Sequence, residues 1–321
     1  MSNARNIAAL NTVEVGATAD QTKADLNAIG VSGGRKNLII NGGMQVWQRG
    51  EDKTLTGNFN GYSTADRIQT QAWISGDRLY RNNISFTHPV SGVAVVDMPF
   101  FRAKASTAGQ TARQINYKID DIASMSGKTY TLSYLYVASS GNFSFKPRIY
   151  VTGVSGVTSF ASDSNVTATN GGVTHRSFTF TVPTLTGVTA ASTLWVQFIN
   201  LNAASANNSI NISEVQLELG SVATDFEHRS YGEELALCQR YYYKNSGESY
   251  AMPYHSSYKM AVVPFPTTMR TNPTMSATTN GTGSAWTNFD PSPRQAKWYV
   301  TEAHSFAGSS YITNMTADAE L

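Results

Sequence analysis

Apolar and small polar residues alternate in run after run of this sequence, with the period of two that is typical of β-strands. In residues 129–137, tyrosine and leucine side chains alternate with threonine and serine. Residues 177–182 alternate in the same way and end at Pro183, whereas residues 194–201 are apolar on both faces, as expected of a central strand. Runs this frequent, separated by Gly, Ser and Asn turns, predict an all-β chain folded as a β-sandwich or jelly roll.

The apolar pattern changes phase once, within residues 210–219. Apolar residues occupy even positions up to Ile212 and odd positions from Val215 onward. One extra residue near Ser213 and Glu214 would produce this change, because a residue added to one strand moves all later side chains to the other face. The sequence therefore predicts a β-bulge at this place.

Charged residues are scarce: they make up 14% of the 321 residues, against about a quarter in ordinary soluble domains. The 24 Lys+Arg and 22 Asp+Glu give a net charge of +2, which argues against a basic surface for nucleic-acid phosphates. The hydrophobic fraction of 41% is ample for a core and excludes general disorder. Apolar stretches such as residues 93–96 and 261–265 are strand-sized, so we expect no membrane insertion.

The common sequence motifs of enzymes and metal sites are missing. No glycine-rich phosphate loop and no Gly-x-Ser-x-Gly nucleophile motif occurs, and the five histidines are scattered. Cys238 is the sole cysteine, which excludes an intrachain disulfide and a cysteine-rich zinc site. The adjacent Asp120 and Asp121 are interpreted as a turn, although a carboxylate pair assembled in space stays open. The sequence predicts no enzymatic activity, no cofactor, no metal and no catalytic residue.

Composition divides the chain into four parts. Residues 1–35 carry few apolar side chains and are predicted to form an extended or partly helical docking segment, the alternative being a flexible tail. Residues 36–229 form the β-sandwich. Residues 230–249 connect it to a smaller β domain at residues 250–321, which is rich in Pro and Gly. That domain, at about 70 residues, has barely enough chain for a core of its own.

A short helix is expected inside the connecting segment. Ser230 and Glu233 fit a capping box, in which the hydroxyl accepts from a first-turn amide. Leu235, Tyr241 and Tyr242 then supply apolar and aromatic surface that the small domain cannot bury alone. We expect these three residues to form the contact of a homotrimer.

One tryptophan has an unusual setting. Trp286 lies among turn residues, with glycines before it and Thr287 and Asn288 after it. Its indole is either folded under a loop or presented as a flat apolar face with a donor at its edge, which suits a sugar ring. The presented alternative gives a carbohydrate-binding site of Trp286 with Trp298 and Tyr254. The other tryptophans are expected in the core (Trp47, Trp73 and Trp195).

Five segments, in order, resemble a domain of tail fibres and receptor-binding proteins of tailed bacteriophages. They begin with NLIINGGMQVWQRG at residues 37–50 and GYSTADR at residues 61–67. A third segment runs from Gln114 to GKTYTLS at residues 127–133, with Met125 where the family has leucine. The last two are residues 214–229, from EVQLELG to ATDFEHR, and CQRYYYK at residues 238–244. The resemblance covers residues 37–244, about two thirds of the chain.

This resemblance implies a jelly roll like that of carbohydrate-binding modules, in a protein that assembles as a trimer on the phage particle. It transfers no ligand residue, because the matching positions look structural. Residues 37–50 are expected to supply a strand and a turn, and Asp66 and Arg67 an internal ion pair. Fold likeness to sugar-binding modules is an analogy, so sugar binding has to be argued from a site.

The leading functional hypothesis is a non-enzymatic tail fibre protein in the virion, assembled in the host cytoplasm. Residues 1–35 would dock on a tail or baseplate protein, and the C-terminal domain would recognise a bacterial surface polysaccharide or lipopolysaccharide. Two alternatives are a purely structural fibre or connector of the tail or capsid, and a polysaccharide depolymerase. No repeat of the length typical of β-helical tail spikes is found, which disfavours the depolymerase.

Overall fold

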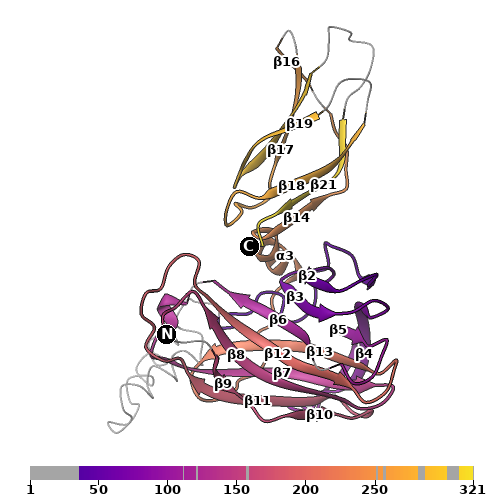
Figure 1. The fold of residues 1–321 in the computed structure, drawn as a ribbon, viewed down its shortest axis with the longest axis vertical. Coiled ribbons are helices and arrows are strands. Elements are labelled where there is room, and N and C mark those ends of the chain that lie inside the picture. The colour runs from indigo at the N-terminus through magenta and orange to yellow at the C-terminus, as the bar shows by residue number, and fades with distance from the viewer. Residues whose placement is uncertain are drawn as a thin grey trace, which may run out of the picture.

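The computed structural model describes residues 36–320 except for 111, 121, 157–158, 251, 256–257, 281–285 and 302–310. The expected docking segment at residues 1–35 lies outside this range. The described chain is almost entirely β, and two β units lie on either side of one helix (Figure 1). None of the helices described is long and apolar enough to cross a membrane.

The larger unit is a sandwich of two antiparallel sheets. The six-stranded sheet has the order β1(Asp52–Thr54), β4(Arg78–Thr87), β5(Ala94–Lys104), β13(Ser209–Leu219), β7(Thr129–Ser139), β11(Thr174–Thr181). The seven-stranded sheet has the order β10(Val166–Ala168), β8(Phe143–Thr152), β12(Thr193–Ala203), β6(Arg113–Ile119), β3(Ile68–Trp73), β2(Phe59–Tyr62), with β9(Ser159–Ser162) on β8. Because neighbours such as β5, β13 and β7 are far apart in sequence, the sandwich is a jelly roll, as expected.

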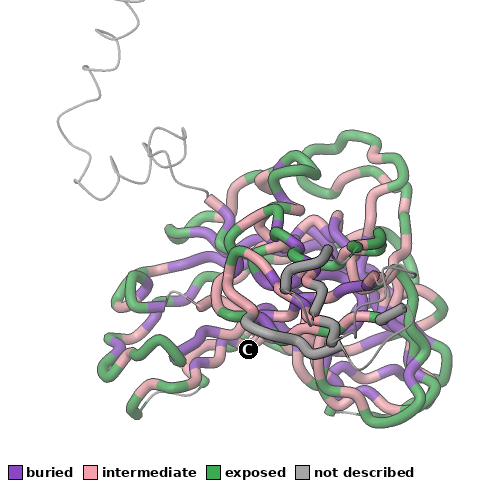
Figure 2. The backbone as a smooth tube through the Cα atoms, turned by 90° about the horizontal axis from the view of Figure 1, so that it is seen from above, coloured by how far each residue is buried: buried purple, intermediate pink, exposed green. Residues whose placement is uncertain are grey.

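The core of the jelly roll lies between the two sheets. Buried segments of the backbone gather in the interior of the molecule (Figure 2). The tyrosines of β7 that alternate with threonine and serine, among them Tyr134, lie in this core. Trp47 and Trp73 are buried there too, as predicted. Trp195 is not: it alternates with the core residues Leu194 and Val196, so it lies half-buried on the opposite face of β12.

The predicted β-bulge is present in β13. The pairing of β13 with β7 shifts register between Ser213 and Gln216. Glu214, inside the shift, has a φ of 46°, a left-handed conformation in which the strand bends locally.

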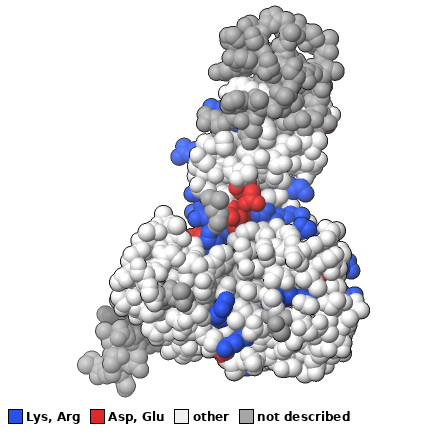
Figure 3. All heavy atoms as spheres, in the orientation of Figure 1, with Lys and Arg blue, Asp and Glu red and all other residues white. Residues whose placement is uncertain are grey.

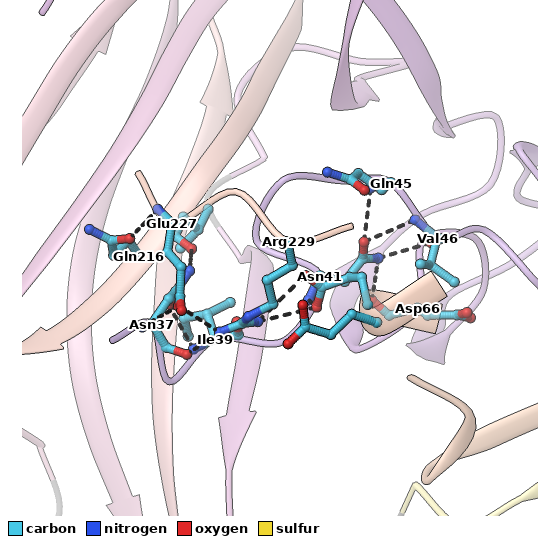
Figure 4. A network of polar contacts seen from close by, with 12 residues as sticks. Asn37, Ile39, Asn41, Gln45, Val46, Asp66, Gln216, Glu227 and Arg229 are labelled. Carbon is cyan, nitrogen blue, oxygen red and sulfur yellow. Dashed lines mark hydrogen bonds and ion pairs between the residues drawn. The ribbon is translucent and has the colours of Figure 1, made fainter. Parts of the chain in front are cut away.

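The segment of residues 37–50 is a set of turns, so the predicted strand there is wrong. Its backbone is held by asparagine side chains instead (Figure 4). The amide of Asn41 donates to the carbonyls of Val46 and Asp66, both at 2.9 Å, and its Oδ1 accepts from the Val46 amide at 3.0 Å. Asn37 Oδ1 accepts from the Leu217 amide on β13 at 3.1 Å. These side chains replace the ladder of hydrogen bonds that a strand would make.

The predicted helix is α3(Tyr231–Gln239), and the Ser230 hydroxyl accepts from the Glu233 amide at 3.3 Å, as expected of its cap. The second unit, which we call the tip, begins directly after it. One sheet of the tip has the order β14(Tyr242–Asn245), β21(Tyr311–Asp318), β15(Ser249–Tyr250), with β18(Thr274–Asn280) also on β21. The other has the order β16(Met252–His255), β17(Tyr258–Pro264), β20(Gln295–Thr301), β19(Trp286–Ser292). Residues 242–250 thus belong to the tip sheet.

Charged side chains gather between the jelly roll and the tip (Figure 3), in a cluster that we call the junction. Glu320, which follows β21, forms ion pairs with Arg49 and Arg67 of the jelly roll. These two guanidinium groups lie over the rings of Tyr242 and Tyr241, each 3.5 Å from the ring centroid. One carboxylate of the tip is therefore held by two arginines of the jelly roll.

The expected ion pair between Asp66 and Arg67 is absent from the junction. Arg67 has a φ of 66°, which turns the chain so that its side chain reaches Glu320, with Asp120 3.9 Å away. Asp66 accepts instead from the side-chain amide of Gln48 at 2.8 Å. Burial raises the pKa of Asp66 to about 6.

Candidate functional site

The structure describes only part of the carbohydrate site expected in the tip. Trp298 lies on β20 in the core of the tip and is 5% exposed, so its face is covered. Trp286 is the first residue of β19 and pairs with Val300, so it is part of a strand and not of a loop. Tyr254 lies on β16. The side chains of Trp286 and Tyr254 lie outside the described part of the structure.

The residues expected at a trimer contact are mostly used within one chain. Tyr241 and Tyr242 are buried at the junction beneath Arg67 and Arg49, and burial raises the pKa of both hydroxyls. Leu235 is half-buried on α3. The two tyrosines therefore offer no open aromatic surface, which corrects the expectation that they do.

A different surface of the molecule combines polar and apolar groups in a hollow. Along β4, residues 80, 82, 84 and 86 alternate with residues whose side chains point the other way, and His88 directly follows the strand. The hairpin of β4 and β5 curls over the sheet, so that Asn82 Nδ2 donates to Asn211 Oδ1 on β13 at 3.0 Å. β13 is two strands away from β4, so the sheet is strongly concave here. We call this concave side of β4, β5, β13 and β7 the groove face.

The groove face contains a cavity of about 390 Å³. β4, β7 and the loop before β11 line it with Asn82, Ile84, Ser85, Phe86, Val137, Ala138, Ser139, Asn170, Gly171, Gly172 and Val173. Beneath Asn82, the fully buried Asn211 donates to the Val137 carbonyl at 3.1 Å and to Ser139 Oγ at 3.0 Å. Asn82, Asn211 and Ser139 thus form a chain of hydrogen bonds that fixes the amide and hydroxyl at the cavity.

The apolar wall of the cavity is formed by Ile84, Phe86 and Val137. The ring of Phe86 lies edge-on to the buried Phe100, with ring centroids 5.8 Å apart, which holds it in one orientation. Rigid apolar walls with a few fixed polar groups are the usual lining of a small-molecule site.

A histidine and a glutamate pair at the bulge end of the groove face. His88 Nε2 lies 3.0 Å from Glu214 Oε2, and His88 Nδ1 accepts from the backbone amides of Val90 and Ser91, each at 3.3 Å. Since Nδ1 accepts, the hydrogen-bond pattern assigns the proton to Nε2, which donates to the carboxylate. His175 lies nearby, and burial lowers its pKa. No three His, Cys, Asp or Glu side chains of the described chain are grouped to hold a metal.

Sequence reasoning placed the site in the tip and missed the groove face. The strip of alternating residues on β4, with Tyr80, Asn82, Phe86 and His88 at every second position, is visible in the sequence. Their meeting with Asn211 and Ser139 is not, because it depends on the curl of the β4–β5 hairpin over β13.

Comparison with known proteins gives a limited result. No protein-family model and no curated protein matches the sequence. A CBM4 structure has 17% identity and a TM-score of 0.35, covering 57% of this chain and 99% of that chain. The C-terminal family 22 carbohydrate binding module of Clostridium thermocellum Xyn10B has 11% identity and a TM-score of 0.35, covering 53% of this chain and 100% of that chain. An exo-beta-agarase has 7% identity and a TM-score of 0.35, covering 60% of this chain and 26% of that chain. Likeness at this level supports no conclusion about function, and the jelly-roll assignment rests on the strand order of the two sheets.

Proposed function

We propose that the chain binds a bacterial surface glycan, a polysaccharide or lipopolysaccharide, on the groove face. The observation that carries this proposal is the hydrogen-bonded chain of Asn82, Asn211 and Ser139 beside the apolar wall of Ile84 and Phe86. A sugar ring has an apolar face and a rim of hydroxyl groups, so it needs both kinds of surface side by side. Because Asn211 is buried and doubly bonded, Asn82 is positioned before a ligand arrives, which reduces the ordering cost of binding.

The biological setting we propose is a non-enzymatic fibre protein in the virion tail of a tailed bacteriophage, assembled in the host cytoplasm. The five segments that resemble such fibre proteins support it. The strip of β4 that lines the groove lies between the second and third of these segments, outside the residues that carry the resemblance. Residues 1–35 are proposed to dock on a tail or baseplate protein.

A homotrimer is part of this proposal, because three weak glycan sites on one axis gain avidity without a strong single contact. We expect light scattering of the full chain to give the mass of three subunits. A stable folded monomer at micromolar concentration would contradict the trimer and leave the glycan site untouched.

The binding experiment screens the full chain against an array of bacterial capsular and lipopolysaccharide glycans, followed by calorimetry with the strongest ligand. We expect Asn82→Ala to weaken binding at least tenfold with little change in Tm. The matched control is Asn83→Ala, since Asn83 is the same residue type on the opposite face of β4 and is exposed. Equal binding by both variants, or no glycan bound by the wild type, overturns the proposal. The second result would favour a structural connector.

The depolymerase alternative has a separate readout. The described residues that line the cavity include no carboxylate, so no acid–base pair of the kind used by most glycosidases is in place there. Release of new reducing ends from the bound glycan would contradict the non-enzymatic role.

A further inference from the structure

We infer that the groove face selects an acidic glycan, whose carboxylate binds Arg102; this inference rests on the proposed glycan site. Arg102 lies on β5 within the groove face. Most arginines of the described chain already have an acidic partner (Arg49, Arg67, Arg78, Arg81, Arg113, Arg176, Arg229 and Arg270). Arg102 has none among the described residues.

The guanidinium of Arg102 is held in place from one side. Its Nε donates to Ser209 Oγ at 3.0 Å, and the ring of Tyr80 lies beside it with the centroid 5.3 Å from Cζ. No described residue accepts a hydrogen bond from Nη1 or Nη2. The two terminal nitrogens of an arginine form a planar fork that matches the two oxygens of a carboxylate. The side chain is therefore oriented by the protein while its fork is left for a ligand.

Arg102 is connected to the cavity through Ser209. Ser209 Oγ, which accepts from Arg102, donates to the carbonyl of Ser139 at 2.9 Å, and Ser139 lines the cavity. The register places Arg102 opposite Asn211 on β13 and opposite Tyr80 on β4. A sugar ring seated against Asn82 and Phe86 would thus have its next substituent at the guanidinium.

The charge around the groove also favours an anion. Lys104 lies two residues from Arg102 on the same face of β5 and has no ion-pair partner in the described chain. Asp52 on the neighbouring β1 pairs with Arg78, and Glu214 accepts a hydrogen bond from His88 at the bulge end of the face. Two cations without counter-charges, on a protein with so few charges, attract an anionic ligand and speed its association at low salt.

The test uses the strongest glycan ligand of the array, native and after chemical reduction of its carboxylates to hydroxymethyl groups. We expect the reduction to weaken binding at least tenfold, and Arg102→Gln to weaken binding of the native glycan by the same factor. Arg102→Gln should not change the affinity for the reduced glycan, because the group it contacts is gone. Arg102→Lys, which keeps the charge but loses the fork, should fall between wild type and Arg102→Gln.

Lys146→Gln is the matched control, since it removes one positive charge from β8 of the other sheet. Its affinity should equal that of the wild type, and all variants should keep the wild-type Tm. If Arg102→Gln loses the same affinity for the native and the reduced glycan, the inference is wrong and the glycan site stands. The same holds if the strongest ligand carries no carboxylate. If the ligand contains phosphate and its binding is lost in Arg102→Gln, the terminal nitrogens of Arg102 bind phosphate, and the proposed carboxylate specificity is wrong. If the wild type binds no glycan at all, the proposed function fails as well.

Discussion

At the residue scale, the neighbouring residues Asp77 and Arg78 form ion pairs in opposite environments, one buried and one exposed. Asp77 accepts from Arg113 Nε and Nη2, both at 2.8 Å, and both side chains are fully buried. Burial opposes ionisation of Asp77, yet the Arg113 hydrogen bonds hold its pKa below the usual value. Arg78 pairs with Asp52 at the surface, where the two side chains are 44% and 46% exposed.

We expect Asp77→Asn to lower the free energy of unfolding by about 3 to 5 kcal/mol, because the buried charge of Arg113 loses its partner. Asp52→Asn removes the same charge from the exposed pair and should cost less than about 1 kcal/mol. Urea denaturation of both variants at neutral pH measures the difference. Similar losses of unfolding free energy in the two variants would contradict the expectation that the buried pair contributes more to stability than the exposed pair.

Asp66 makes a second prediction at this scale. Its pKa is raised from 3.8 to about 6, chiefly by burial, so the folded chain keeps this proton to a higher pH than the unfolded chain. Its contribution to stability is therefore complete below pH 4 and is lost as the pH rises through 6. We expect Asp66→Asn to gain about 3 kcal/mol relative to wild type across this interval. Parallel stability curves from pH 4 to pH 8 would disprove it.

At the element scale, local sequence patterns predicted the strands. They failed where contacts with residues far along the chain determine the backbone conformation. Alternation located β7, β11 and β12, and the phase change located the bulge in β13. Residues 37–50 have apolar residues in a strand-like order, but Asn37 bonds to backbone atoms of Val215 and Leu217, far along the chain. The sequence around Asn37 contains no pattern that would indicate these distant hydrogen-bond partners. The groove face was missed for the same reason, because Asn82 and Asn211 meet only through the curl of a hairpin.

Gly42 tests how closely that turn segment approaches β13. Its carbonyl accepts from the Val215 amide at 3.0 Å, and a Cβ at Gly42 would overlap the Val215 carbonyl oxygen. We expect Gly42→Ala to lower the free energy of unfolding by about 2 to 3 kcal/mol, because both partners are backbone and neither can yield cheaply. Gly57→Ala is the control, since a Cβ there meets nothing within 4 Å. Equal shifts of Tm in the two variants would show that Gly42 does not approach the Val215 carbonyl as closely as described.

At the scale of the whole molecule, two cores are joined by a charged junction. The jelly roll and the tip each bury their own apolar cluster, and Glu320 bridges them through Arg49 and Arg67. Sequence reasoning found both β units but expected tyrosines on an open surface where the structure has buried cation–ring contacts.

Glu320→Ala should lower the free energy of unfolding by about 3 kcal/mol, because two buried guanidinium groups lose a shared carboxylate. Small-angle scattering should then show a larger radius of gyration as the tip moves away. Asp318→Ala is the matched control: its side chain is 42% exposed and pairs with Arg49 at 3.3 Å, so its loss should be small. Unchanged scattering in Glu320→Ala would show that the remaining contacts across the junction, such as Arg49 with Asp318 and Arg270 with Asp120, hold the tip without Glu320.

The bridging carboxylate also decides how mechanical load passes through the molecule. The chain crosses from α3 into β14 once, and a single crossing leaves rotation of the tip about that segment free. Glu320 supplies a second attachment point beside it, so rotation is blocked. Because Arg67 also donates to the Lys118 carbonyl on β6 at 2.9 Å, a sideways pull on the tip is passed directly to the seven-stranded sheet. A tip drawn against a surface would therefore drag the jelly roll with it as a rigid lever.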